Sequence, residues 1–461
     1  MHYKDFPQPR RLLQMLGPSF LVIATGIGSG EIILWPLIAS DYWLWLVRVA
    51  LIGITCQFFI NMEIERYTLA TWETVFWWLH RLRKYAPQRF VFSTFLSFAF
   101  PGTVAASAQI FWSLLGIENY SYLAILGLLI AWFTLSIWSK VYDTFETLAK
   151  ILLSILVVWL VIFVWHIAWY DEFLALGQWF IWQWDWYTRI PEWISLASLS
   201  WAFAYAWTWW NLNLTQSNYV DEEGYGMGKY TPKLSWLFTD KTNDKKNAWP
   251  HSFELNKKNL HRFNTRRKRM NIEHFFVFRC IWLLTIALLM MIAYIASPEN
   301  ANHTEWVYFI IQQAKYIGET YHSIIGTLFM VVVGVLLLQS QIWIYDGWVR
   351  IMTKNIEKLS LGQKYSSWKI YYSLLRSRII AWIIIFLLGI TNPVVLVTIS
   401  ASISALSMFV HIWLVNFMNH SQLPQKLQPN IFRKWIMIII FLLFLFSVTI
   451  LIYDSLHSLI W

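Results

Sequence analysis

The stretch "ATGIGSGEIILWP", Ala24 to Pro36, places a carboxylate inside an apolar segment long enough to cross a bilayer. An ionisable group near the middle of a membrane costs about 3 kcal/mol on insertion scales and usually faces a polar pathway. The stretch predicts an interrupted membrane helix whose break holds a site around Glu31. The alternative is a kinked helix whose small residues pack against a neighbour. The small residues that weaken the helix are Gly26, Gly28, Ser29 and Gly30.

The composition is that of a polytopic membrane protein. Of the 461 residues, 57% are hydrophobic and 13% are charged, whereas a soluble chain carries about a quarter charged residues. The cysteines Cys56 and Cys280 lie in apolar runs without a CxxC partner, so we expect neither a disulfide nor a zinc site. The sequence contains no P-loop, nucleophile elbow or HExxH motif, so we expect neither an enzyme nor an ATP-driven pump, and no cofactor.

Eleven apolar runs predict eleven transmembrane helices. With a cytoplasmic N-terminus, only Arg48, Arg189 and Lys315 of the 36 Lys and Arg fall on the outer half. This asymmetry follows the positive-inside rule and predicts a multi-pass protein of the cell membrane, plasma or inner. The predicted spans are Gly17–Ser40, Leu44–Ala70, Phe90–Leu115, Tyr120–Ser139, Thr144–Ala168, Trp193–Val220, Phe275–Ser297, Ser323–Trp348, Tyr371–Ile390, Pro393–Phe417 and Trp435–Tyr453.

The longest predicted cytoplasmic loop, Asp221–His274, carries the basic cluster "NTRRKRM", Asn264 to Met270. Together with the net charge of +10, this cluster leaves nucleic-acid binding as one interpretation. The interpretation we prefer is a solvated loop beside anionic lipid head groups. The expected partner is therefore the lipid bilayer and not nucleic acid.

A second interrupted helix is predicted in the other half of the chain. The sixth span contains "AYAWTWWNLNLTQSNYV", Ala204 to Val220, where amides and hydroxyls follow a tryptophan cluster. Interrupted helices five spans apart indicate a secondary transporter with two inverted repeats and its site between the breaks. The predicted parts are an N-terminus (1–16), a first repeat of spans 1–5 (17–168), a second repeat of spans 6–10 (193–417, with the basic loop 221–274) and an eleventh span (435–453).

These stretches resemble the NRAMP family of divalent-metal transporters, in a divergent bacterial branch. The matching segments are "GPSFLVIATGIGSGEIILWP" (Gly17 to Pro36), "NMEIERYTLAT" (Asn61 to Thr71), "NLTQSNYV" (Asn213 to Val220) and "GYGMG" (Gly224 to Gly228). The resemblance covers nearly the whole chain. It implies an all-α, LeuT-type fold of eleven transmembrane helices, built as a 5+5 inverted repeat plus one extra helix. It also implies alternating access, in which spans 1, 2, 6 and 7 rock against the others.

The metal ligands of the resembled family are changed here. The family carries Asp-Pro-Gly-Asn in the first break, where this chain has "GSGE": Gly28 replaces the Asp and Glu31 replaces the Asn. The position of the family's methionine ligand falls on Thr208 or Trp209. Oxygen ligands favour Mg²⁺, Mn²⁺ or Ca²⁺ over Fe²⁺ or Cd²⁺. The predicted site comprises Glu31 as the metal ligand, with Gly28, Ser29, Gly30, Thr208, Asn211 and Asn213.

Other interpretations stay open for this site. Glu31 could serve a non-metal solute as a proton carrier, or the protein could be a non-transporting membrane sensor on the same fold. Protons remain a candidate second partner, although the acidic residue that the family carries in its third span is absent. Glu63, Glu65 and Arg66 form a predicted gate or proton relay at the cytoplasmic end of span 2. The alternative for these three is a structural network at the interface.

Tryptophan is abundant where small residues are expected. The chain has 32 Trp and 18 Gly, whereas Gly averages about 7% of residues. The motif "WTWWN", Trp207 to Asn211, stands where the resembled branch is glycine-rich. One hypothesis is that these tryptophans are glycines in the living protein. A stop codon reassigned to glycine in the cell, but read as tryptophan in the conceptual translation of the gene, would produce this pattern. The alternative is genuine tryptophans that narrow the site. The codons distinguish the two.

Overall fold

All the regular secondary structure in the described residues of the computed structural model is helical. The described residues are 4–9, 11–15, 18–28, 30–71, 73–82, 85–97, 101–117, 119–137, 141–180, 203, 213–230, 253–296, 306–357, 359 and 364–460. The first half contains η1 Leu12–Met15, α1 Pro18–Gly26, η2 Gly30–Leu34, α2 Trp35–Tyr42, η3 Trp43–Leu46, α3 Val47–Thr71, α4 Val75–Leu82, α5 Ala86–Ser97, α6 Gly102–Leu115, α7 Tyr120–Ile137, α8 Val141–Ile167 and α9 Tyr170–Phe180.

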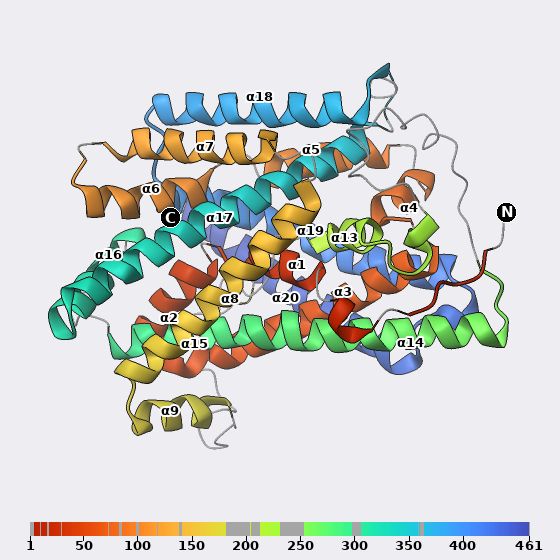
Figure 1. Cartoon of the computed structure of the whole chain (residues 1–461), viewed down its shortest axis with the longest axis horizontal. Helices are drawn as coiled ribbons and strands as arrows, with labels where there is room; N and C mark the ends of the chain where they lie inside the picture. Colours follow the sequence, from red (N-terminus) through yellow and green to blue (C-terminus); the bar gives the residue numbers. More distant parts are fainter. Residues whose placement is uncertain are drawn as a thin grey trace.

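The second half continues the helical arrangement (Figure 1). Its helices are α13 Gln216–Glu222, η4 Gly226–Tyr230, α14 Lys257–His274, η7 Phe275–Ile281, α15 Trp282–Ile295, α16 Trp306–Thr320, α17 Ser323–Ile356, α18 Ser367–Leu387, α19 Pro393–Gln422, η9 Gln425–Leu427 and α20 Ile431–Ile460.

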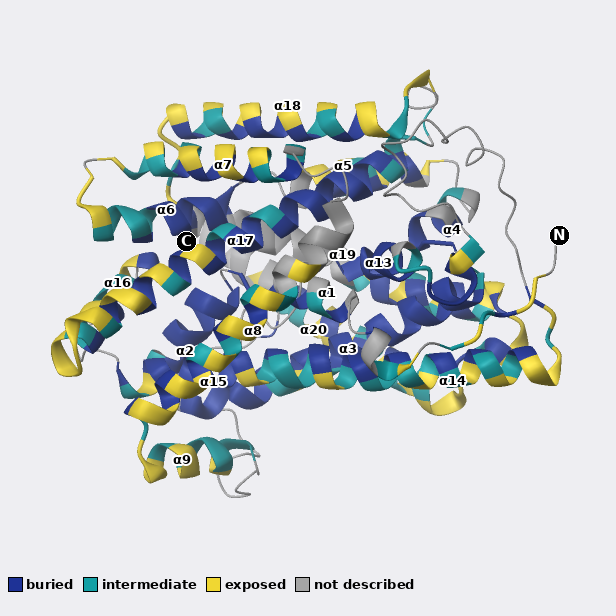
Figure 2. Ribbon diagram, viewed as in Figure 1, coloured by how far each residue is buried: buried dark blue, intermediate teal, exposed yellow. Residues whose placement is uncertain are grey.

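Exposed apolar faces identify the surface that meets lipid. Six of the described helical segments are long and apolar enough to cross a membrane. On α18, Ile380, Ile384 and Leu387 are 58%, 51% and 67% exposed, and Figure 2 shows such exposed positions along the outward sides of α18 and α7. Large aliphatic side chains are stable at the surface of a membrane protein because lipid tails are as apolar as a protein core. The chain is therefore a multi-pass membrane protein, as the composition predicts, while the count of eleven spans stays a prediction.

The described helices differ from the predicted spans at two places. The predicted third span, Phe90–Leu115, corresponds to two helices, α5 and α6. Part of the predicted basic loop is helical: α14 covers Lys257–His274 and continues into η7 and α15. Figure 1 shows α14 and α15 end to end across the lower half of the molecule, above α9. The side chain of Asn256 begins α14 by accepting a hydrogen bond from the Asn259 backbone N–H at 2.8 Å, which satisfies an otherwise unpaired donor of the first turn.

Two long helices organise the packing. The helix α3 contacts α13, η4, α15, α14 and α19, whereas α17 crosses the middle of the molecule and contacts α6, α16, α5 and α18 (Figure 1). Small residues at the start of α6, in "GTVAASA", allow its backbone to approach α17 closely. The Ser107 hydroxyl donates to the Gly334 carbonyl at 2.7 Å across this contact. The helix α1 joins the helices around α3 to those around α17, since it contacts α13 as well as α17.

Candidate functional site

The helix that begins at Pro18 is interrupted where the small residues predict it. The α-helix α1 ends at Gly26, and a π-helical turn, η2, begins at Gly30 before α2 continues from Trp35. A π-helical turn replaces the regular α-helical hydrogen bonds over a few residues, and such turns are frequent at functional sites. The segment from Gly30 to Leu34 is buried throughout. The break therefore lies inside the protein, which is where irregular backbone is tolerated in a membrane.

Glu31 lies in this break and is 2% exposed. Its Oε2 accepts a hydrogen bond from the Gly28 backbone N–H at 3.0 Å. Among the residues that the structure describes, no cationic side chain forms an ion pair with Glu31. Trp282 is fully buried beside it, and its indole N–H is directed at the Glu31 carboxylate without the geometry of a regular hydrogen bond. A buried carboxylate with so few partners is able to receive a cation.

The opposite wall of the break comes from α17 and includes Ser340, which the sequence analysis missed. A Cβ built on Gly28 would lie 2.8 Å from the Ser340 Oγ, so the absence of a side chain at Gly28 permits this approach. The Ser340 side chain is 1% exposed, and its hydroxyl has no hydrogen-bond partner among the described residues. The polar triplet Gln339–Gln341 within an otherwise apolar helix is the signal that could have identified it.

The predicted site residues are only partly brought together. Gly28, Gly30 and Glu31 share the break, whereas Ser29 lies outside the described residues, as do Thr208 and Asn211. Asn213 is described and buried, and its Oδ1 accepts a hydrogen bond from Gln57 Nε2 of α3 at 2.9 Å. No described contact joins Asn213 to Glu31. The predicted break of the sixth span, around residues 207–211, also lies outside the described part, and the chain resumes as a helix in α13.

The predicted gate residues divide into two sets on opposite sides of α3. Glu63 pairs with Arg66, whose Nε lies 2.8 Å from Glu63 Oε2, and with Arg433 of α20, whose Nη1 lies 2.9 Å from Glu63 Oε1. Asn419 of α19 donates to the same carboxylate at 3.0 Å. This ion-pair network ties α3 to α19 and α20. These contacts are those expected of the structural network that was the alternative for Glu63 and Arg66, and the gate or proton relay stays a prediction.

Glu65 faces away from that network. Its Oε1 accepts a hydrogen bond from the Gln216 amide of α13, and the same oxygen lies 3.7 Å from His274 Nδ1. Its Oε2 has no hydrogen-bond partner among the described residues. Glu65 is 2% exposed and therefore belongs to a buried polar cluster between helices. The sequence alone does not separate Glu65 from Glu63, because two positions along a helix change the direction of a side chain by more than half a turn.

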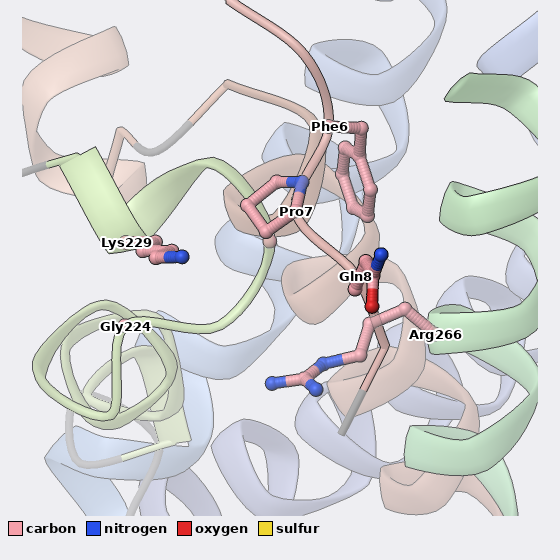
Figure 3. A pocket seen from close by; sticks show the side chains of 7 residues that line it. Phe6, Pro7, Gln8, Gly224, Lys229 and Arg266 are labelled. Atoms are coloured by element: carbon pink, nitrogen blue, oxygen red, sulfur yellow. The ribbon is translucent and has the colours of Figure 1, made fainter. Parts of the chain in front are cut away.

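A polar cavity of about 340 Å³ lies apart from the break. It is formed between the N-terminal segment, η4 and α14, and Lys229 and Arg266 point toward one another across it (Figure 3). None of the residues that line it belongs to the break in α1. The cavity is therefore a feature of the basic end of the molecule and not part of the Glu31 site. Its lining residues are Phe6, Pro7, Gln8, Gly224, Gly226, Lys229 and Arg266.

The glycine hypothesis rests on tryptophans near the predicted break of the sixth span. Trp207, Trp209 and Trp210 lie outside the described residues.

The fold matches solved structures of a manganese transporter of Eremococcus coleocola. A glutamate-to-glutamine variant of that protein has a TM-score of 0.71 at 12% identity and covers 99% of this chain and 90% of that chain. A histidine-to-alanine variant has a TM-score of 0.70 at 12% identity, with coverage of 98% and 90%. A complex with an aromatic bis-isothiourea substituted compound has a TM-score of 0.66 at 13% identity, with coverage of 96% and 87%.

The likeness to these transporters supports the fold that the NRAMP resemblance implies. No protein-family model matches the chain, and a comparison with curated protein sequences finds no relative. At 12–13% identity, a structural match establishes the fold and leaves the substrate undetermined. The chain is thus a helical membrane protein with the fold of a metal-ion transporter, and its own chemistry must be argued from its site.

Proposed function

We propose that the protein is a secondary transporter of a hard divalent cation and a divergent member of the NRAMP-like group. The observation that carries the proposal is Glu31, a buried carboxylate without a described cationic partner, in the break of α1. The fold likeness to a manganese transporter adds support. The proposal includes eleven spans with a cytoplasmic N-terminus, arranged as the two repeats predicted above.

The cation site combines Glu31 with neutral oxygens. The Ser340 hydroxyl faces Gly28 and has no described partner, so it is a candidate ligand from α17. Gly28 offers its carbonyl, which accepts one hydrogen bond from the Ile32 N–H at 3.0 Å and retains a second lone pair. Ser29, Thr208, Asn211 and Asn213 complete the proposed set. With one carboxylate and otherwise neutral oxygens, the site favours Mg²⁺, Mn²⁺ or Ca²⁺ over softer metals.

Alternating access moves the helices around α1 relative to α17. In this proposal α1, α3, α13 and α15 form the rocking group, which corresponds to spans 1, 2, 6 and 7. The Glu63 ion-pair network joins α3 to α19 and α20 and therefore stabilises one end-state of the movement. At the same end of the molecule, Lys354 Nζ of α17 donates to the Asn218 side chain of α13 at 2.9 Å. Both contacts cross from the rocking group to the rest of the protein.

Cation flux into vesicles tests the proposal. We expect vesicles that contain the protein to take up Mg²⁺, Mn²⁺ or Ca²⁺, and we expect Glu31→Gln to abolish this uptake. The amide has nearly the same shape as the carboxylate and keeps an oxygen for the Gly28 N–H, so the variant should stay inserted and monodisperse. Glu254→Gln, which removes a carboxylate charge from an exposed residue, is the matched control and should transport normally.

Two outcomes would contradict the proposal in different ways. Full cation uptake by Glu31→Gln would remove Glu31 from the site and with it the main argument for a cation. An absence of flux for every tested ion and small solute, with the protein correctly folded, would favour a membrane sensor on a transporter fold.

A further inference from the structure

A buried cluster of acid and base groups surrounds the first turn of α1, apart from the break. The Ser19 hydroxyl lies 2.6 Å from Glu273 Oε2 and 2.7 Å from His274 Nδ1, both at the end of α14. Ser19 and His274 are fully buried, and Glu273 is 5% exposed. One hydroxyl group therefore bridges a carboxylate and an imidazole. The two partners are adjacent in sequence and about 250 residues away from Ser19 along the chain.

The numbers of donors and acceptors on Ser19, Glu273 and His274 determine which atoms carry the hydrogens. Ser19 has one hydroxyl hydrogen and donates it to the ionised Glu273, which can only accept. The Ser19 oxygen must then accept from His274, so Nδ1 of the imidazole carries a hydrogen. The other ring nitrogen, Nε2, lies 2.9 Å from the Asn61 side-chain nitrogen and accepts from it when the imidazole is neutral. The result is a continuous chain of donors and acceptors from His274 through Ser19 to Glu273.

The groups around His274 include acceptors that could stabilise its protonated form. Asn61 Oδ1 has no described hydrogen-bond partner, so a rotation of the amide would let it accept from a protonated Nε2. Glu65 supplies a second carboxylate 3.7 Å from His274 Nδ1. The other groups around the ring are apolar: Phe278 stacks on it with a centroid separation of 4.4 Å, and Phe58 lies at 5.8 Å. The charged groups that face Glu65 are Glu273 and, from α20, Arg433.

We propose that Ser19 relays a proton between His274 and Glu273, and that this cluster is the proton-binding site of the transporter. The inference deepens the proposed function and rests on it for the link to cation movement. A hydronium ion of the aqueous phase gives a proton to Nε2 of His274, which becomes an imidazolium, and leaves a water molecule. The Nδ1–H then passes to Ser19 Oγ, while the original Ser19 hydrogen passes to Glu273. The imidazolium and carboxylate thereby become a neutral imidazole and a neutral carboxylic acid, with no net change in atoms or charge.

The position of Ser19 couples this relay to the cation site. Ser19 is the second residue of α1, and the same helix ends at Gly26, directly before the break that holds Glu31. Because α14 continues into α15, α1 and α14 both belong to the rocking group, and the relay depends on how α1 tilts relative to α14 within that group. A tilt that separates the start of α1 from the end of α14 moves Ser19 away from Glu273 and His274. The relay then loses its central hydroxyl. Proton transfer is therefore permitted in one position of α1 and interrupted in the other.

Variants of Ser19 separate the relay from a structural role. In vesicles that contain a pH-sensitive dye, we expect a gradient of the transported cation to drive proton movement through the wild-type protein. We expect Ser19→Ala to lower this proton flux at least tenfold, because no hydroxyl then joins the two partners. Ser19→Thr keeps the hydroxyl and should restore most of the flux. Equal proton flux in the wild type and Ser19→Ala would overturn the proposal, as would cation transport by the wild type without any proton movement.

Infrared difference spectra of the purified protein provide a readout that does not depend on transport. A step to lower pH should produce a carboxylic-acid band that is lost in Glu273→Gln and strongly reduced in Ser19→Ala. If the wild type shows this band but transports no cation, the relay stands and the proposed function fails. A band that is unchanged in both variants contradicts the relay, whatever the transport assay shows. Glu273→Gln also serves as the second variant if Ser19→Ala gives too little folded protein.

Discussion

Glu31 and Glu63 are equally buried, at 2% exposure each, and have opposite surroundings. Glu63 contacts two guanidinium groups and an amide, whereas Glu31 receives a backbone N–H and has no described cationic neighbour. The free energy of burying a charge depends on its partners, so the same residue type serves two purposes. Glu63 is already neutralised and joins helices, whereas Glu31 is the carboxylate that we propose as the ligand of an external cation.

The largest expected effect is the loss of stability in Glu63→Gln. The substitution leaves Arg66 buried without its compensating charge, and Arg433 loses the same partner. Breaking a buried pair by removing one partner costs about 3–5 kcal/mol. In Glu31→Gln we expect a change within about 1 kcal/mol, because the amide oxygen still accepts from the Gly28 N–H.

Thermal unfolding of both variants in the same detergent checks this contrast. A fall in the unfolding midpoint for Glu31→Gln as large as that for Glu63→Gln would mean that Glu31 has a buried cationic partner. In that case the distinction between a neutralised carboxylate and an available one would be lost.

A smaller loss of stability is expected when a methyl group is added at a glycine near the end of α3 or in the break of α1. Gly226, beside the end of α3, has φ 56°, and a Cβ there would lie 2.6 Å from the Leu69 backbone carbonyl. Gly226→Ala combines backbone strain with a clash that no side-chain rotation relieves, so we expect a loss of at least about 2 kcal/mol. In Gly28→Ala the new methyl group meets the Ser340 hydroxyl, which is able to rotate away.

Unfolding midpoints of these glycine variants form a graded series. Gly116→Ala is the control for strain alone, because Gly116 has φ 65° and no described atom lies within 4 Å of the position that a methyl group would take. We expect Gly226→Ala to lower the unfolding midpoint more than Gly116→Ala does. Gly28→Ala differs from both variants because we expect it to lower the affinity for the cation. A Gly28→Ala protein that binds cations normally would contradict the close approach of Ser340 to the site.

The smallest expected effect is that of Ser340→Ala on stability. The hydroxyl has no described partner, so its removal should leave the unfolding midpoint almost unchanged. The apparent affinity for the cation should fall about tenfold, which corresponds to about 1.4 kcal/mol. Ser107→Ala is the matched control on α6: it loses a hydrogen bond to the Gly334 carbonyl and should lower stability without affecting cation affinity. Equal affinity in the two variants would exclude Ser340 as a ligand.

Part of the site was predictable because its signal is local. The small residues before Glu31 lie close to it along the chain, and their effect on helix continuity needs no information about distant segments. Ser340 and Trp282 were missed because serine and tryptophan are ordinary in membrane helices. Their importance arises from the approach of α17 and α15 to the break. His274 was missed for the same reason, since its polar partners come from α1 and α3.

The sequence by itself determined that the protein crosses a membrane, that its elements are helical and that the first helix is interrupted at a carboxylate. Hydropathy, small-residue spacing and the position of a charge within an apolar run depend only on residues that are close together in the sequence. They can therefore be recognised without knowledge of the tertiary structure. Only the tertiary structure decided which carboxylates are neutralised. Arg433 reaches Glu63 across 370 positions, and Ser19 reaches Glu273 across 254. The free energy of a buried charge depends on neighbours in space, and helix packing alone brings these neighbours together.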